Sequence, residues 1–496
     1  MGRVAAAEAS VILELDRGTD TPLHHQLYEG LREAILAGRL AGGTKLPSTR
    51  ALACELGLSR NTVADAFRQL SAEGYLKGKV GSGTYVCESL PDGLLAARPG
   101  KAAAETQAGH DTHRLSRRGR LLADTRTSTV RDAGSEARAF RPGVPALEEF
   151  PARTWRRLEN EIWRRPLGRL LGYGEPAGYG PLRQMISEYL GATRGLSCEP
   201  EQVIVVSGSQ QALDLCARLL LDPDDAAWLE DPCYAGARAA LCAGGAHLAP
   251  VPVDGEGIDV GAGEERAPDG RLAYVTPSHQ YPSGVTMSAS RRLSLLRWAR
   301  RTGSWILEDD YDGEFRYQSR PLQALQGLDT DGRVIYLGTF SKVLFPALRL
   351  GYLVIPPGLV DAFEAARELT DRHPPTVEQA VLAEFISGGH FSRHVRRMRT
   401  LYAERQEALI AAASRELSGW MDVEPCGAGM HLVGRLPEAT DDVGASQLAA
   451  GKGIEAPPLS AHCLEKTSSS GLLLGYAAFD EQAIDAGSRR LAEALQ

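Results

Sequence analysis

The chain has 496 residues, more than one ordinary hydrophobic core accommodates, so we expect at least two domains. Its composition, with 43% hydrophobic and 24% charged residues, includes no apolar run of the ~20 residues that a membrane span needs, which excludes an integral membrane protein. The net charge of -8 argues against nonspecific nucleic-acid binding by the whole molecule, so any contact with DNA must be local.

The N-terminus and the cysteines indicate an intracellular protein. The first residues lack the basic region and the long apolar core of a signal peptide. The eight cysteines are scattered, with no CxxC pair and no His/Cys cluster at the spacing of metal ligands. We therefore expect a cytoplasmic protein with reduced thiols, no metal site and no membrane partner.

Residues 11–87 have the pattern of a small DNA-binding module. Periodicity predicts three helices, in LHHQLYEGLREAILAGRL, TRALACELG and SRNTVADAFRQLSAEG. They are followed by YLKGKVGSGTYV, in which two short strand-like runs flank a glycine-rich turn. The order of helix, helix-turn-helix and hairpin indicates a winged helix-turn-helix of the α+β class.

The third predicted helix carries the side chains best suited to read DNA. Gly57 makes the turn before this helix, and Ser59 is its expected N-cap. Arg60, Asn61 and Thr62 then occupy the first turn, where a recognition helix reaches bases and phosphates. An arginine can fork onto guanine and an asparagine can pair with adenine, so this turn is a candidate for base recognition.

Further DNA contacts are expected from the preceding helix and from the wing. Arg50 would lie close to the DNA backbone. Gly81 and Gly83 allow the wing backbone to approach a groove, and Lys77 and Lys79 flank them. The alternative is a structural or protein-binding bundle whose basic residues face solvent, and the wing favours DNA binding.

The rest of the chain divides into a linker and a second domain. Residues 88–138 are rich in Ala, Gly and Arg and show little sustained periodicity, so we interpret them as a linker. From residue 139 to residue 496, apolar strand-like runs alternate with helical ones, as in QVIVVSG followed by SQQALDLCARLLL. This alternation predicts an α/β domain with a largely parallel sheet.

Several features of residues 139–496 meet the needs of pyridoxal 5′-phosphate chemistry. This cofactor requires a lysine for its aldehyde, an acid at the pyridine nitrogen, a partner for the phenolate oxygen and a phosphate cup. Lys342, after an apolar run in GTFSKVLFPALRLGYL, is the candidate for the Schiff base. Arg349 and Ser341 can bind the phosphate. Ser209 and Gln210 begin a helix in SGSQQALDL, whose free amides can face the same phosphate.

The candidates for binding the cofactor ring lie on two other segments. Asp309, in SWILEDDYDGEF, would keep the pyridine nitrogen protonated, and Tyr311 would hydrogen-bond the phenolate oxygen. Pattern alone does not decide whether Asp309 or Asp310 faces the ring. Tyr234, in LEDPCY, is a candidate for stacking on the ring. Each residue alone has a structural interpretation, as a surface cation, strand end or helix cap, and their combination in this order favours a cofactor site.

These motifs carry a resemblance to a known family. LPSTRALACELGLSRNTVADAF and GSGTYV resemble the winged helix of GntR-type regulators. The segments YGEPAGYGPLR, EDPCY, TPSHQYPSG, EDDYDGEFRY and TFSKVLFPALRLGYL resemble the MocR subfamily of these regulators, whose second domain is similar to fold-type I aminotransferases. The spacing in that family favours Asp309 over Asp310. The resemblance implies DNA contacts at Arg50, Ser59, Arg60, Asn61, Thr62 and Gly81.

The resemblance also implies an assembly. Fold-type I sites lie at a subunit interface, so a homodimer is expected, in which Tyr173 of one chain reaches the phosphate in the other. The two chains would be arranged head to tail, with each DNA-binding module packed on the partner's large domain.

Two departures from the aminotransferase pattern bear on function. Where Asn-Pro-Thr-Gly is common near the phenolate oxygen, this chain reads YPSG at residues 281–284, so the Asn role is vacant or passes to His279 or Gln280. Many aminotransferases hold the substrate carboxylate with an arginine on a late strand, and GLLLGYAAFD places Leu473 near that position. Without the arginine, efficient transamination of a conventional α-amino acid is disfavoured.

We therefore expect a transcriptional regulator that binds promoter DNA and pyridoxal phosphate. Its effector would be the cofactor itself, or an amine or amino acid forming an aldimine with it, and its targets would be genes of vitamin B6 or amine metabolism. We do not expect an enzyme, although a residual transaminase half-reaction stays open. The alternative is an active aminotransferase with an accessory DNA-binding domain. A DNA-binding scaffold with a vestigial cofactor fold is disfavoured by the intact set of Lys342, Asp309 and Arg349.

Overall fold

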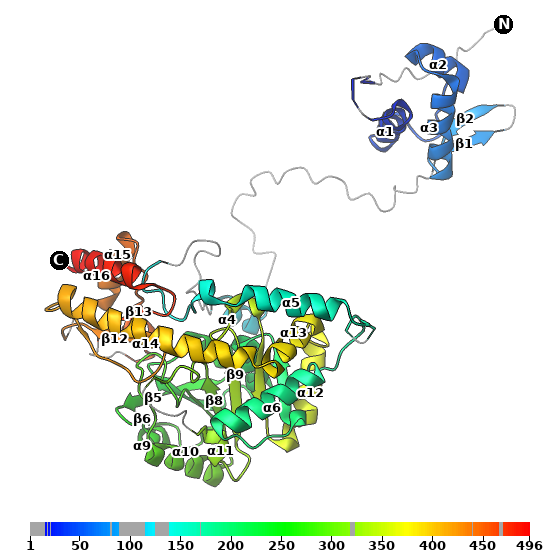
Figure 1. The fold of residues 1–496 in the computed structure, drawn as a ribbon. Helices are drawn as coiled ribbons and strands as arrows, with labels where there is room; N and C mark the ends of the chain where they lie inside the picture. The colour runs from blue at the N-terminus through cyan, green and yellow to red at the C-terminus, as the bar shows by residue number, and fades with distance from the viewer. Residues whose placement is uncertain are drawn as a thin grey trace, which may run out of the picture. The chain divides into compact units, whose positions relative to one another are not determined.

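The chain folds into two compact units, Met1–His113 and Arg114–Gln496 (Figure 1). The computed structural model describes residues 15–16, 18–19, 21–79, 82–88, 115–124, 138–168, 170–317, 323–438, 440–465 and 470–496. Within these ranges, no helix combines the length and the apolar character that crossing a membrane requires. All eight cysteines are described, and all are free thiols.

The first unit is a small helical module with a two-stranded hairpin. Its elements are α1 (Leu23–Leu36), α2 (Thr49–Leu56), α3 (Arg60–Ala72), β1 (Leu76–Lys79) and β2 (Gly83–Val86). The buried faces of α1 and α3 pack together through Leu27, Ala34, Val63 and Ala66, all fully buried. This core is separate from those of the second unit, and it places the hairpin beside the recognition helix as expected for a winged helix.

The second unit is built on an eight-stranded sheet in the order β3-β10-β9-β8-β7-β4-β5-β6. The strands are β3 (Val203–Val206), β4 (Ala226–Asp231), β5 (His247–Asp254), β6 (Gly257–Ile258), β7 (Leu272–Val275), β8 (Trp305–Asp310), β9 (Val334–Thr339) and β10 (Gly351–Val354). β10 is antiparallel to both of its neighbours and β6 is antiparallel to β5, whereas the pairs from β9 to β5 are parallel. The predicted α/β domain with a largely parallel sheet is confirmed.

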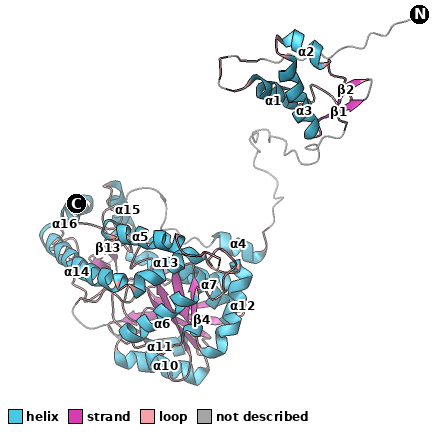
Figure 2. Ribbon diagram, turned by 45° about the vertical axis from the view of Figure 1, so that its right-hand side comes forward, coloured by secondary structure: helices cyan, strands magenta, loops and turns pink. Residues whose placement is uncertain are grey.

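Helices cover both faces of this sheet, as Figure 2 shows. The helices of this part of the unit are α4 (Arg117–Asp124), α5 (Ala152–Trp163), α6 (Gly180–Arg194), α7 (Ser209–Leu220), α8 (Ala235–Gly244), α9 (Val260–Arg266), α10 (Ala289–Thr302), α11 (Leu325–Leu328), α12 (Val360–Asp371) and α13 (Thr376–Ser387). Along β3, Val203 and Val205 belong to the core with α6 and α13, and Ile204 and Val206 belong to the core with α7 and α8. All four side chains are fully buried, which explains the continuous apolar run in the sequence.

A smaller C-terminal layer completes the second unit. It consists of α14 (His390–Glu416), β11 (Asp422–Val423), β12 (His431–Arg435), α15 (Asp442–Gly451), β13 (Gly471–Gly475) and α16 (Glu481–Leu495), with β11-β12-β13 forming an antiparallel sheet. Short 3-10 helices cover Leu147–Glu149, Pro200–Gln202, Pro346–Leu348, Pro357–Leu359 and Leu459–His462.

In the described part of the predicted linker, which spans residues 88–138, there is one helix. α4 has the sequence RRGRLLAD and packs against α8 of the second unit. Its arginines, leucines and alanine are good helix formers, which outweighed the absence of a longer periodic pattern. Most of the remaining segment lies outside the described residues, so the predicted boundaries at 87 and 139 stay predictions.

Candidate cofactor site and nucleic-acid interface

A cavity of about 400 Å³ lies in the second unit where strands β8 and β9 end. Parallel α/β sheets generally bind ligands at the carboxyl ends of their strands. Residues from several elements of the chain line this cavity. Among them are the predicted cofactor residues Lys342, Asp309, Tyr311, Tyr234, Ser209, Gln210, Ser341 and Arg349.

Lys342 lies in the loop that follows β9. Its Nζ donates a hydrogen bond to the backbone oxygen of Gly143, 2.7 Å away. Gly143 has φ +73°, a conformation that favours glycine, and a Cβ at this position would lie 2.8 Å from that Nζ. Burial lowers the pKa of Lys342, and the negative charges of Asp312 and Asp309 oppose this effect. The lowered pKa increases the neutral, nucleophilic fraction of the amine.

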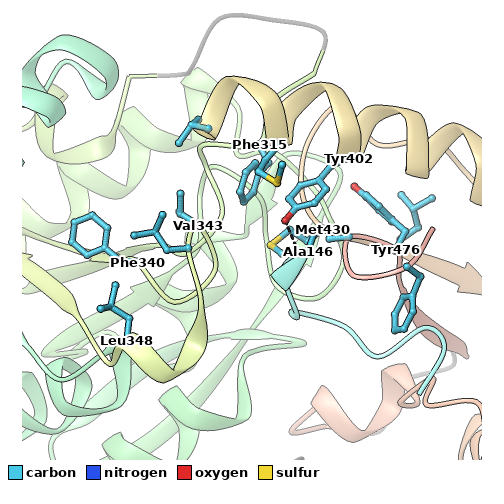
Figure 3. Close-up of a cluster of buried hydrophobic side chains, with 14 of the residues drawn as sticks. Ala146, Phe315, Phe340, Val343, Leu348, Tyr402, Met430 and Tyr476 are labelled. Atoms are coloured by element: carbon cyan, nitrogen blue, oxygen red, sulfur yellow. Dashed lines mark hydrogen bonds between the residues drawn. The ribbon is translucent and has the colours of Figure 1, made fainter. Parts of the chain in front are cut away.

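A buried hydrophobic cluster holds the lysine loop in place (Figure 3). Phe340 and Val343 flank the lysine in sequence, and both side chains are buried in this cluster. Tyr402 of α14 belongs to the same cluster, and its hydroxyl accepts a hydrogen bond of 3.0 Å from the amide of Ala146. The cluster therefore fixes the loop that carries Lys342 and also the segment that carries its partner Gly143.

Asp309, at the end of β8, presents a free acceptor to the cavity. One carboxylate oxygen accepts a 2.8 Å hydrogen bond from the Tyr274 hydroxyl, and the other, Oδ1, is buried without a partner in the described structure. Burial raises the pKa of Asp309 to about 7. Asp310 does not line the cavity, because its carboxylate is bound by Arg194 at 2.7 Å and by the Tyr336 hydroxyl at 2.6 Å. The structure thus places Asp309, and not Asp310, at the cavity.

Tyr311 lies against a buried ion pair. Its hydroxyl is 2.9 Å from Nδ1 of His279, and the same nitrogen lies 2.9 Å from the Asp312 carboxylate. Burial lowers the pKa of His279, but the charge and hydrogen bond of Asp312 more than compensate and raise it to about 10. His279 is therefore a cation at neutral pH, and it positions Tyr311 from behind.

The predicted replacements for the missing Asn side chain do not reach the cavity. His279 is not among the residues that line it, and Gln280 hydrogen-bonds Glu230 and the backbone oxygen of Pro232 instead. His279 contacts Tyr311 instead, and its predicted direct contact with the cofactor stays a prediction. The cavity is lined at this point by Tyr281, the first residue of the YPSG segment.

The N-terminus of α7 and the loop after β9 form an anion-binding corner. α7 begins at Ser209 after Gly208, whose φ of +98° favours glycine, and a Cβ there would lie 3.2 Å from the Arg349 guanidinium. Arg349 donates a 2.6 Å hydrogen bond to the backbone oxygen of Ser207. The hydroxyl oxygen of Ser341 is buried without a partner in the described structure. A guanidinium, a free hydroxyl and helix amides at one corner suit a phosphate group.

The cavity therefore fits pyridoxal phosphate on the chemistry of its own residues. The unpartnered Oδ1 of Asp309 would accept a hydrogen bond from a protonated pyridine nitrogen, and the unpartnered Ser341 hydroxyl would face a phosphate. The Lys342 amine lies on the same cavity. Two buried polar atoms without partners are a cost to the protein that a bound group with these features would remove.

The two predicted aromatic residues have different surroundings. Tyr234 lines the cavity, and its ring makes an edge contact with Tyr281, at 5.8 Å between centroids. Tyr173 does not line the cavity and is 84% exposed, with the Arg372 guanidinium 4.9 Å from its ring. Its predicted contact with a partner chain stays a prediction.

Sequence reasoning missed several polar residues of the cavity. Arg141 and Glu455 form an ion pair at 3.4 Å, and His431 and His462 lie beside Tyr281, with ring centroids 5.4 and 5.3 Å from its ring. No local pattern marks these residues, because they come from separate segments of the chain, and Arg141 and Glu455 lie more than 300 positions apart. Tyr274, the partner of Asp309, was also missed, because it lies 35 positions earlier in the chain, on the neighbouring strand β7.

The predicted recognition helix has the expected start. Gly57 ends α2 with φ +62°, and the Ser59 hydroxyl caps α3 by accepting a hydrogen bond from the Thr62 amide at 3.1 Å. Arg60 and Asn61 are exposed on the first turn of α3. The predicted cap is confirmed, and it leaves both side chains free to reach a groove.

The remaining predicted DNA contacts lie on α2 and the hairpin. Arg50 is exposed on the first turn of α2, and Lys77 is exposed on β1. Lys79 lies over the ring of Tyr85, at 5.3 Å, which steadies the cationic end of the hairpin. Gly81 lies outside the described residues.

Leu473 occupies the strand position where the missing arginine was expected. It lies in β13, is fully buried and pairs with Val433 of β12. It does not line the cavity, so neither charge nor a hydrogen-bonding group enters the site from this position.

Comparisons with known proteins agree with this two-part organisation. Residues 23–86 match the family of bacterial regulatory proteins called gntR, which implies DNA binding, and residues 145–490 match Aminotransferase class I and II. The chain is 44% identical over 98% of its length to the probable rhizopine catabolism regulatory protein MocR of Rhizobium meliloti, covering 96% of that protein. It is 30% identical to the HTH-type pyridoxine biosynthesis transcriptional regulator PdxR of Corynebacterium glutamicum, over 96% of both chains.

The second unit also resembles solved aminotransferases. The structure of LysN, an α-aminoadipate aminotransferase from Thermus thermophilus complexed with N-(5′-phosphopyridoxyl)-L-leucine, has a TM-score of 0.70 at 31% identity and covers 76% of this chain and 96% of that chain. Full-length similarity, however, is to regulators, which supports regulation over the aminotransferase alternative. The chain belongs to the MocR subfamily of GntR-type transcriptional regulators, in which a winged helix-turn-helix precedes an aminotransferase-like domain.

Proposed function

We propose that this regulator holds pyridoxal phosphate in the cavity at Lys342 and uses it to sense a small molecule that changes its binding to promoter DNA. The observation that carries the proposal is a buried lysine amine sharing one cavity with the unpartnered oxygen of Asp309 and the unpartnered hydroxyl of Ser341. Pyridoxal phosphate supplies an aldehyde that reacts with amines and a ring that withdraws electrons.

Each part of the cavity has an assigned role in this proposal. Lys342 would bind the aldehyde carbon covalently through its amine, and Asp309 would accept a hydrogen bond from the protonated pyridine nitrogen. Tyr311, held by His279, would donate its hydroxyl to the phenolate oxygen. Arg349 would bind the phosphate together with Ser341, Ser209 and the amides that begin α7.

Sensing is favoured over turnover by what the cavity lacks. Fast transamination needs a substrate carboxylate held firmly, and Leu473 contributes no charge from β13. The effector is therefore the cofactor itself, or an amine or amino acid that reacts with it. By analogy with the named relatives, the target genes would serve pyridoxine synthesis or the breakdown of an amine.

Regulation would operate through a homodimer. Two chains arranged head to tail would present two winged helices, so the operator should contain a direct or inverted repeat. Arg50, Arg60, Asn61 and Lys77 would contact DNA in each half-site. Effector binding would shift the population toward the dimer arrangement that binds the effector more tightly, and the size of the shift depends on the difference between the two affinities.

Two measurements test the proposal together. Borohydride reduction of the protein with added pyridoxal phosphate should leave the cofactor on the Lys342 peptide, as seen by mass spectrometry, and Lys342→Ala should abolish both this product and the visible absorbance of the bound cofactor. Mobility shifts on the region upstream of its own gene should show sequence-selective binding that changes with cofactor or amine. Rapid multiple-turnover transamination without selective DNA binding would defeat the regulator proposal.

A further inference from the structure

The cavity contains a second group of polar residues that the proposed cofactor contacts do not use. We call it the effector group, and it consists of Arg141, Tyr281, His431, Glu455 and His462. These side chains come from the segment before α5, the loop after β7, the start of β12, the segment after α15 and the 3-10 helix Leu459–His462. Because the proposed cofactor contacts do not use these five side chains, we ask which ligand they could bind.

The effector group has no net charge at neutral pH. The Arg141 guanidinium lies 3.4 Å from the Glu455 carboxylate, with the two side chains 20% and 32% exposed, so each charge is compensated by the other. Burial lowers the pKa of His431 to about 3 and that of His462 to about 4, so both rings are neutral. The other cations lining the cavity are Lys342 and Arg349, which the cofactor would engage.

The two histidines offer hydrogen bonds to uncharged polar groups. Nδ1 of His462 is buried and has no partner in the described structure. His431 is 3.0 Å from the backbone oxygen of Pro282 through Nε2, which assigns the ring proton to that nitrogen and leaves Nδ1 as an acceptor. A hydroxyl group both donates and accepts, so it satisfies either tautomer of His462 and also the acceptor on His431.

A carboxylate finds no matching partner in this group. Leu473 provides only apolar, fully buried atoms in β13. Binding a carboxylate at Arg141 would require displacement of Glu455 or would place two carboxylates beside one guanidinium. Like charges at close range raise the cost of binding, so the pair acts as a barrier against anionic ligands.

We propose that the effector is a primary amine that bears hydroxyl groups and lacks a carboxylate, such as an amino alcohol or an amino polyol. This inference rests on the proposed function, because the amine nitrogen would react with the cofactor held at Lys342. The hydroxyl groups would hydrogen-bond His431, His462 and the Arg141–Glu455 pair. The proposal thus narrows the effector from any amine or amino acid to one chemical class.

The test compares two ligands that differ at a single carbon. Serinol and L-serine share an amine and a hydroxymethyl group, and serine has a carboxylate where serinol has a second hydroxymethyl group. Full-length protein loaded with pyridoxal phosphate is titrated with each, by calorimetry and by the change in cofactor absorbance. We expect serinol to bind at least about tenfold more tightly, because a carboxylate left without hydrogen-bond partners in the cavity loses the hydration that it has in water.

The Glu455→Gln variant tests whether the Arg141–Glu455 ion pair disfavours carboxylate ligands. This variant leaves Arg141 without its counter-ion, so it should strengthen serine binding and reduce or reverse the preference for serinol. Glu465→Gln is the matched control, because Glu465 pairs with Arg266 at 2.9 Å and does not line the cavity. Cofactor absorbance and thermal melting establish that each variant is folded and loaded.

The outcomes separate this inference from the proposed function. Tighter binding of serine than serinol by the wild type, or binding of neither ligand, overturns the inference, as does an unchanged preference in Glu455→Gln. Tighter serinol binding that leaves DNA mobility shifts unaltered supports the ligand class but defeats the proposed regulatory response. Failure of the Lys342 borohydride product would defeat the proposed cofactor role irrespective of the ligand comparison.

Discussion

Replacing Asp309 with asparagine should make the cofactor-free protein more stable at alkaline pH. The pKa of this buried carboxyl rises from 3.8 to about 7, so the folded chain keeps a proton that the unfolded chain has lost. Its stability cost therefore grows as pH rises from about 4 to about 7 and is complete above about 7. Asparagine removes the titration and keeps an oxygen able to accept the hydrogen bond from Tyr274.

The size of the effect follows from the two pKa values. A rise from 3.8 to about 7 corresponds to about 4 kcal/mol in full, at about 1.4 kcal/mol per pH unit. About 1.5 kcal/mol of this is already present at pH 5, so the variant should gain about 2.5 kcal/mol relative to wild type between pH 5 and pH 8. Asp309 is 3% exposed, so solvent screens little of the effect.

Urea unfolding followed by tryptophan fluorescence measures this difference. All six tryptophans lie beyond residue 150, so their fluorescence reports on the second unit. Glu230→Gln is the control, because burial also raises the pKa of Glu230 to about 7 but Glu230 does not line the cavity. Both variants should show the gain, but only Asp309→Asn should weaken cofactor binding. An equal stability difference from wild type at both pH values would refute the reasoning about Asp309.

Three other predictions test separate parts of the chain. Gly143→Ala should reduce cofactor absorbance per chain, because its Cβ would lie 2.8 Å from the Lys342 nitrogen, and full loading would contradict the assigned contact. Ser59→Ala should speed hydrogen exchange of the α3 amides at a cost of about 1 kcal/mol and weaken DNA binding, whereas unchanged exchange would argue against the cap. Cys426 should react with iodoacetamide at a lower pH midpoint than an ordinary thiol, because burial alone would raise its pKa but the neighbouring His279 outweighs that effect and lowers it. Peptide mass spectrometry should show a higher midpoint in His279→Gln, and equal midpoints would exclude this coupling.

The parts of the site that could be predicted from sequence are those encoded by short local motifs. Lys342 and Arg349 share one loop, and Ser59 caps the helix that it precedes, so neighbours in the chain suffice to identify them. The strand that ends near Asp309 is visible in the sequence as an apolar run, but only the structure shows that the Asp309 side chain faces the cavity. Asp310 is adjacent in sequence and points to Arg194, 116 positions away.

What sequence could not supply is the pairing of distant residues. The ion pair between Arg141 and Glu455 joins a segment near the start of the second unit's sequence to one near its end, and no sequence spacing predicts this pairing. Sequence also could not show how the His279 side chain is placed. Its Nδ1 contacts Tyr311 and it does not line the cavity, and a motif does not distinguish a side chain that faces a cavity from one that packs behind the lining residues.

The antiparallel turn from β9 to β10 has a mechanical consequence. Lys342 and Arg349 both lie between these paired strands, so one hairpin carries both proposed anchors of the cofactor. A cofactor bound to both residues would be held at its aldehyde end and at its phosphate end by this one segment of the chain. If its bond to Lys342 were released, Arg349 would still hold its phosphate end through the same segment of the chain.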